Sequence, residues 1–158
     1  MADVVDHYDA SAPTYSEQYD ESKVLTSKEY PANFFRLKKI KRRLTELGLS
    51  SVYELGIGDG SPLAALGDMG LRVAGGDLSE GILAVARAQF EAKGLDASGL
   101  TWGDIQERLT LESAIATGPY DGVLALGVLP HVRDEAVAFD SMSAFIGSGG
   151  TMFLQLRN

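Results

Sequence analysis

The stretch VYELGIGDGSPLAAL, residues 52–66, contains the residues of this chain that are best suited to bind a ligand. Gly56, Gly58 and Gly60 alternate along it, and the acidic Glu54 lies just before them. Glycines let a backbone approach a ligand closely and adopt φ > 0. A helix that begins directly after such a loop turns its free N–H groups and its dipole toward the ligand. The spacing therefore predicts a nucleotide-type ligand at this loop.

Three kinds of glycine loop can be distinguished by their chemistry. A Walker-type loop ends in Lys followed by Ser or Thr, whereas Gly60 is followed by Ser61 and Pro62, so this kind is excluded. The dinucleotide pattern G-x-G-x-x-G would place its third glycine where Ser61 stands. Asp59, an acid inside the loop, would also lie unfavourably close to a pyrophosphate, whereas a cationic ligand tolerates both Glu54 and Asp59. A ligand with positive groups, such as a sulfonium and an α-ammonium, is favoured.

The pattern around the loop predicts the elements that must position it. Residues 1–26 are expected to form a mobile or short-helical leader, and residues 27–158 a single cofactor-binding domain. A helix is expected over residues 27–47, and Ser61 and Ser79 are expected to cap two more. Further helices are expected in LTLESAIA and RDEAVAFDSMSAFI, and a glycine turn in GSGG. The expected strands are SVYEL, LRVAGGD, LTW, YDGVLALGVL and TMFLQLR.

Strands that alternate with helices of this length indicate parallel βαβ units, and hence an α/β fold with five strands. In such sheets a ligand binds at the carboxyl ends of the strands, where the strand order reverses. The glycine loop follows the first strand and is therefore expected at that edge.

Composition limits the classes of function. The 158-residue chain carries a net charge of −8, which argues against binding a phosphate backbone. We interpret the basic run LKKIKRR, residues 37–43, as a solvated helix face. Cysteine is absent, which excludes thiolate catalysis and fits a cytoplasmic protein. No apolar run approaches the roughly 18 residues that span a bilayer. We expect a small-molecule partner, with no nucleic acid and no membrane.

Taken in order, these segments resemble the class I S-adenosylmethionine-dependent methyltransferases that act on small molecules. VYELGIGDG resembles their first motif, which is an apolar strand, an acid and then G-x-G-x-G. In the leader, SAPTYSEQYD is similar to the family's A-x-x-Y-D pattern, with Ser16 where Asp is usual. The later segments that resemble family elements are VAGGDLSEGIL, WGDI, YDGVLALGVLPHV and FIGSGGTMFLQ.

The resemblance implies a Rossmann-like, doubly wound sheet that is mostly parallel. Family members continue through another helix and two more strands after the fifth strand, whereas this sequence stops at Asn158. We therefore expect a chain cut short after the fifth strand and lacking the usual last two. The alternatives are an open sheet edge that a partner chain or a second copy covers, and a natural minimal form of the fold.

The resemblance also implies S-adenosylmethionine as cofactor and S-adenosylhomocysteine as product. At the position of Asp77 the family's acid accepts hydrogen bonds from both ribose hydroxyls; the alternative is a helix cap. Glu54 either holds the loop or reaches the α-ammonium. Asp104 contacts the adenine amino group or caps its own loop, and Tyr15 closes over the cofactor or packs in the leader. The full set of implied cofactor-binding residues is Tyr15, Glu54, Gly56, Gly58, Gly60, Asp77, Leu78, Asp104, Ile105, Leu126 and Gly127.

Methyl transfer from a sulfonium is an in-line displacement, so the protein must mainly align the acceptor and exclude water. An acceptor hydroxyl or ammonium must also lose a proton, and histidine is the usual base. His131 follows the fourth strand in GVLPHV and is the candidate catalytic base; the alternative is a packing or capping residue. His7, in the leader, is a weaker candidate. No His, Asp and Glu cluster has metal-ligand spacing, so no metal is predicted.

We therefore predict an enzyme, a methyltransferase that modifies an oxygen or nitrogen of a small molecule. One alternative is a non-catalytic module that binds S-adenosylmethionine or S-adenosylhomocysteine and acts through a partner protein. Another is an NAD-dependent oxidoreductase, against which the displaced third glycine argues.

Overall fold

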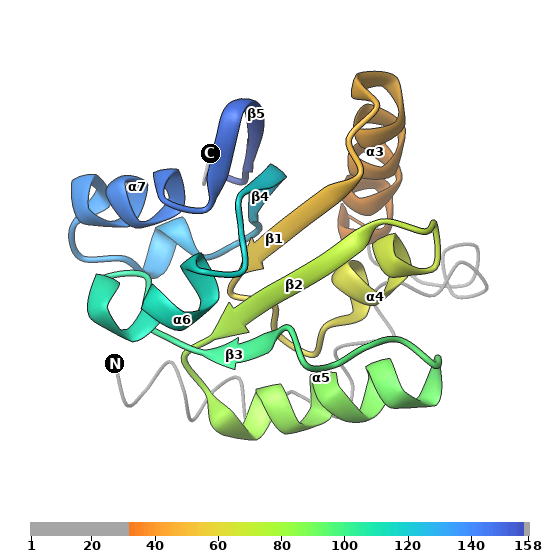
Figure 1. The fold of residues 1–158 in the computed structure, drawn as a ribbon, viewed down its shortest axis with the longest axis horizontal. Coiled ribbons are helices and arrows are strands. Elements are labelled where there is room, and N and C mark those ends of the chain that lie inside the picture. Colours follow the sequence, from red (N-terminus) through yellow and green to blue (C-terminus); the bar gives the residue numbers. More distant parts are fainter. Residues whose placement is uncertain (1–31, 157–158) are drawn as a thin grey trace.

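The computed structural model of the protein describes residues 32–156, and the leader with its Tyr15 and His7 lies outside this range. The described chain forms one five-stranded sheet in the order β3-β2-β1-β4-β5, and every neighbouring pair is parallel (Figure 1). This confirms the predicted α/β fold with five parallel strands. The strands are β1 (Ser51–Leu55), β2 (Arg72–Asp77), β3 (Leu100–Trp102), β4 (Tyr120–Ala125) and β5 (Ile146–Leu154).

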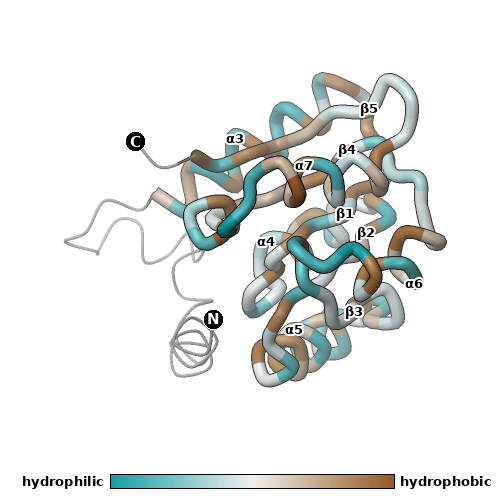
Figure 2. Tube along the Cα trace, turned by 90° about the vertical axis from the view of Figure 1, so that its left-hand side faces the viewer, coloured by the Kyte–Doolittle hydropathy of each residue, from teal (hydrophilic) through white to brown (hydrophobic). Residues whose placement is uncertain are grey.

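Helices cover both faces of the sheet. One apolar cluster joins α3, α4 and α5 to the sheet, and a second cluster joins α6 and α7 to its other face (Figure 1). Figure 2 shows the apolar and polar residues alternating along α5, as expected of a helix that buries one side. The helices are α3 (Ala32–Leu47), α4 (Ser61–Gly67), α5 (Glu80–Ala92), α6 (Glu112–Ile115) and α7 (Glu135–Ser143), with 3-10 turns η2 (Arg108–Leu111) and η3 (Leu129–His131).

Strand β1 lies at the centre and is buried along its whole length. Its side chains alternate between the two faces, so Val52 enters one apolar cluster while Tyr53 and Leu55 enter the other. The Tyr53 ring stacks on Phe145 with 4.0 Å between the ring centroids. Because both faces and both edges of β1 are covered, its carboxyl end is held rigidly where the glycine loop begins.

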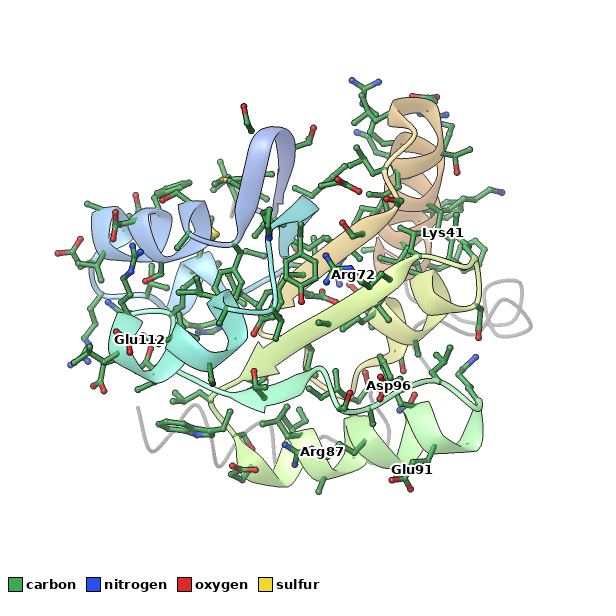
Figure 3. The ribbon with its side chains drawn as sticks, viewed as in Figure 1. Lys41, Arg72, Arg87, Glu91, Asp96 and Glu112 are labelled. Atoms are coloured by element: carbon green, nitrogen blue, oxygen red, sulfur yellow. The ribbon has the colours of Figure 1, made fainter. Side chains whose placement is uncertain are left out.

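The basic side chains of residues 37–43 lie on the outer side of α3, as predicted, while Leu37 and Ile40 of the same segment are buried. Lys38, Lys39, Arg42 and Arg43 are exposed, and Figure 3 shows Lys41 pointing away from the sheet. Arg42 and Arg43 both pair with Glu46, at 3.5 and 3.2 Å. Among the described helices, none has the length and apolar character needed to cross a membrane.

Two predicted helix boundaries were wrong. The N-cap of α4 is Gly60, at φ 76°, and Ser61 is already the first helical residue. The Ser61 hydroxyl donates instead to the Asp59 carboxylate at 2.7 Å, so it does not cap the helix. The helix expected in LTLESAIA is only the η2 turn followed by the four residues of α6. Ser79 was predicted correctly, because its hydroxyl accepts the amide of Ile82 at 3.1 Å.

The predicted glycine turn lies inside β5 rather than before it. Ile146 already pairs with Tyr120, and pairing resumes between Thr151 and Gly122. The four residues between Ile146 and Thr151 bulge out of the ladder, and Gly149 there has φ 79°. This irregular strand forms one edge of the described sheet (Figure 1).

Candidate functional site

A pocket of about 140 Å³ lies at the carboxyl ends of β1, β2, β3 and β4. The register brings these ends level, since Leu55 pairs with Gly76 on one side and with Ala125 on the other. The order of the strands reverses between β1 and β4, which is where open α/β sheets bind ligands. The lining residues are Leu55, Gly56, Gly58, Gly76, Asp77, Leu78, Ser79, Gly103, Asp104, Ile105, Gln106, Leu126, Gly127, Val128, His131 and Val132.

The glycine loop is fastened to β2 by its backbone. The amides of Gly56 and Ile57 both donate to the Gly76 carbonyl, at 2.8 and 3.2 Å. Gly56 has φ 73°, and a Cβ there would lie 2.1 Å from a methyl group of Val128. Gly60 does not line the pocket; a Cβ on it would lie 2.9 Å from Ala86 of α5. The first two glycines of the motif therefore face the pocket, and the third allows α4 and α5 to pack.

Asp77 lies at the end of β2 on the pocket wall. One carboxylate oxygen accepts the Gly58 amide at 3.0 Å, and the other accepts the Ser79 amide at 3.1 Å. The cap of α5 is Ser79, so Asp77 joins the glycine loop to the segment after β2 rather than capping the helix. A charge-assisted bond from each amide fixes the orientation of this carboxylate.

Asp104 provides a second acid from the next strand along the sheet edge. It is buried, and one carboxylate oxygen accepts the Gln106 amide at 2.8 Å. Its own amide donates to the Thr110 hydroxyl at 2.8 Å. The local capping role considered for Asp104 is therefore present, and the same residue lines the pocket next to Ile105.

Glu54 lies behind the pocket and is not part of its lining. Its side chain is 1% exposed, and within residues 32–156 its Oε2 atom has no hydrogen-bond partner. Burial is the main reason that the pKa of Glu54 is raised to about 8. Arg36 of α3 opposes this rise, and the carboxylates of Asp59 and Asp77 add to it. Burial therefore favours the protonated, neutral form of Glu54.

The segment after β4 forms the remaining wall. Gly127 has φ 87°, and the η3 turn follows with His131 at its end. His131 is exposed and lines the pocket. In the part of the chain that the structure describes, no group of three or more His, Asp or Glu side chains could hold a metal ion.

The structure brings most of the predicted site residues together. Glu54 and Gly60 lie outside the lining, and Tyr15 lies outside the described residues. Those that line the pocket are Gly56, Gly58, Asp77, Leu78, Asp104, Ile105, Leu126, Gly127 and His131.

Several lining residues were missed. Val128 and Val132 could have been found, because apolar residues in a loop that follows a strand often cover a ligand. Gly76 could also have been found, because a glycine inside a strand often marks a place where a ligand or another segment approaches the backbone closely. In the structure, a Cβ at Gly76 would lie 2.9 Å from the Tyr53 hydroxyl. Gln106 could not have been found from the sequence, because its position depends on how two distant loops meet.

Comparison with known proteins identifies the family. The family model described as "Methyltransferase domain" matches residues 53–154, which include every residue that lines the pocket. The chain belongs to this family of methyltransferases.

Curated relatives share this assignment. The chain is 27% identical to a "Ubiquinone biosynthesis O-methyltransferase" of Stutzerimonas stutzeri, over 98% of this chain and 64% of the relative. A protein of the same name in Dinoroseobacter shibae is 29% identical, over 68% of this chain and 41% of the relative. A third, in Acinetobacter baumannii, is 28% identical, over 96% of this chain and 60% of the relative. The chain therefore spans less than two thirds of the length of these relatives.

Solved structures match the fold. An S-adenosylmethionine-dependent methyltransferase from Clostridium acetobutylicum superposes with a TM-score of 0.67 at 19% identity, over 90% of this chain and 56% of that one. A methyltransferase from Thiobacillus denitrificans in complex with S-adenosylhomocysteine gives 0.58 at 22% identity, over 75% and 46%. These likenesses confirm the Rossmann-like fold.

Proposed function

We propose that this protein binds S-adenosylmethionine and transfers its methyl group to an oxygen or nitrogen of a small molecule. The observation that carries the proposal is the Asp77 carboxylate, which lies on the pocket wall and is held by the amides of Gly58 and Ser79. A carboxylate fixed in this way suits the two hydroxyls of a ribose, which are hydrogen-bond donors.

The charge of the pocket supports the same cofactor over a dinucleotide. Two acids, Asp77 and Asp104, are among the described residues that line it, and these residues include no Lys or Arg. A pyrophosphate would meet carboxylates there without a cation to balance it. The cofactor's sulfonium and α-ammonium groups suit such a site, and its adenine amino group can donate to Asp104.

The protein's part in the reaction is to position, to exclude water and to move one proton. When bound, the cofactor supplies a methyl group on a sulfonium. Leu126 and Gly127 would hold the methionyl end, while Val128 and Val132 shield the pocket from water. His131 would take the proton that an acceptor hydroxyl or ammonium loses during transfer. The names of the curated relatives support an oxygen acceptor.

A calorimetric titration with S-adenosylhomocysteine, with NAD as control, tests cofactor binding. We expect a dissociation constant at roughly micromolar level, about −8 kcal/mol, and no heat from NAD. A folded sample that gives no heat with S-adenosylhomocysteine, or binds NAD more tightly, would overturn the proposal.

Replacing His131 with Ala is expected to lower methyl transfer to small phenols and amines by about 10²-fold or more, since it removes the general base. Cofactor affinity should stay nearly unchanged, because the imidazole is needed only by the acceptor. Added imidazole should restore part of the rate if His131 is the base. A full rate in His131→Ala, or a loss that imidazole does not relieve, would assign His131 to packing.

Binding without turnover on any acceptor would instead favour the non-catalytic module, which acts through a partner. The β5 edge of the described sheet is where we would place such a partner or a second copy. A cytoplasmic location is likewise proposed, on the absence of cysteine.

A further inference from the structure

Two loops that are far apart in the sequence meet at the pocket, and one side chain forms a hydrogen bond between them. The loop after β3 contributes Asp104 and Gln106 to the wall, and the segment after β4 contributes His131 and Val132. The Gln106 side-chain oxygen accepts the backbone amide of Arg133 at 2.7 Å. This bond connects the loop that contains Asp104 to the segment that contains His131, the candidate base.

Gln106 is itself held from the cofactor side. Its backbone amide donates to the Asp104 carboxylate at 2.8 Å, so the two residues form one hydrogen-bonded turn. The Asp104 carbonyl accepts the Glu107 amide at 2.9 Å, which closes the same turn. A ligand group that binds the Asp104 carboxylate would therefore restrain Gln106 as well.

On the other side of the pocket, the segment that carries His131 begins with a short 3-10 turn. The η3 turn has three residues, closed by bonds from the His131 and Val132 amides to the Val128 and Leu129 carbonyls, at 2.9 and 3.3 Å. A 3-10 turn of this length is weak by itself. The next helix, α7, begins only after its N-cap at Asp134. Arg133 lies between the two elements, and its amide is directed to Gln106 instead.

Apolar packing brings the same two loops together. Ile105 and Leu129 are both buried in one apolar cluster, and Val128 and Val132 pack against it. This apolar contact holds the two loops against each other. A hydrogen bond depends on direction, whereas apolar contact does not, so the bond from the Arg133 amide to Gln106 also constrains how the two loops are oriented.

We propose that Gln106 is a positioning residue that couples ligand binding at Asp104 to the placement of the His131 turn. The inference rests on the proposed function, because it takes the pocket to bind the cofactor's adenine at Asp104. Its consequence is that binding of the cofactor stabilises the placement of the His131 turn on the acceptor side of the pocket. Coupling of this kind typically changes an equilibrium by about 5- to 150-fold.

Amide hydrogen exchange measured by NMR on the full 158-residue chain tests this coupling directly. In the wild type, S-adenosylhomocysteine should slow exchange of the Arg133 amide at least about fivefold. It should also slow the amides of Gly58 and Ser79, which bond to Asp77. Gln106→Leu should keep the protection at Gly58 and Ser79 and lose it at Arg133. Gln106→Glu retains an acceptor oxygen and should preserve both.

The outcomes separate the two proposals. Two results would overturn the coupling and leave the proposed cofactor intact. In the first, the ligand slows exchange of the Arg133 amide as much in Gln106→Leu as in the wild type. In the second, the ligand protects Gly58 and Ser79 in the wild type but does not slow the Arg133 amide. No protection at any of these amides in the wild type would overturn the proposed cofactor, and the coupling with it. If Gln106→Leu does not fold, Gln106→Ala removes the same acceptor without adding bulk, and the same comparison applies.

Discussion

Asp77→Ala will weaken binding of S-adenosylhomocysteine by at least about tenfold, because a hydrogen bond to a charged group contributes roughly 1.5–3 kcal/mol. In the proposed complex the carboxylate accepts from the ribose hydroxyls while it retains the amides of Gly58 and Ser79. Calorimetric titration of wild type and variant measures the loss.

The variant also removes the bonds to those two amides, so a loss of affinity by itself does not prove contact with the ribose. A 2′,3′-dideoxy analogue of the ligand separates the effects. The wild type should bind this analogue more weakly than the parent ligand, whereas Asp77→Ala should bind both alike. Equal discrimination by the two proteins would contradict the ribose role.

Asp121 offers a matched control. Its carboxylate also accepts backbone amides, those of Ser50 and Ser51 at 2.9 and 3.0 Å, but it lies near the amino end of β4, opposite the pocket. Asp121→Ala should lower thermal stability and leave ligand affinity unchanged.

Glu54→Gln will change how stability depends on pH. The folded-state pKa of Glu54, about 8, lies above the ordinary value of 4.5. Between these values the unfolded chain gives up its proton while the folded chain keeps it, so rising pH favours unfolding. The slope is up to about 1.4 kcal/mol per pH unit, or about 4–5 kcal/mol over the whole interval. Below pH 4.5 the group is protonated in both states and contributes no pH dependence.

Denaturant unfolding of wild type and Glu54→Gln at pH 5, 6, 7 and 8 measures this effect. The amide has nearly the shape of the acid but does not titrate, so other titrating groups cancel in the difference between the two proteins. The stability of the variant relative to the wild type should grow steadily from pH 5 to pH 8. Parallel stability curves would mean that Glu54 is ionised throughout, with Arg36 compensating its charge.

The parts of the fold that follow from local pattern could be predicted from the sequence. Alternating strands and helices, and the Ser79 cap, depend on residues close together in the chain. The Gly60 cap could not be predicted, because Ser61 has an equally suitable side chain whose hydroxyl is taken by Asp59. The bulge in β5 depends on pairing with β4, which a single strand's sequence does not specify.

The candidate site divides in the same way. Asp77 and Asp104 could be found because Asp77 ends one strand and Asp104 closely follows another, and the strand ends of a parallel sheet share one edge. The bond from the Arg133 amide to Gln106 and the electrostatic contact between Arg36 and Glu54 could not be found. Both join segments whose approach is decided by the packing of whole helices and loops.

During synthesis of the chain, the central strand β1 can pair with β2 before its second neighbour, β4, has been synthesised. β1 can pair with β2 as soon as residue 77 has emerged, whereas β4 is complete only at residue 125. At about 5–20 residues per second, one edge of this fully buried strand stays unpaired for roughly 2–10 s. Substitutions that slow the pairing of β4 should therefore first reduce the yield of correctly folded chains, before any loss in the stability of the finished protein becomes measurable.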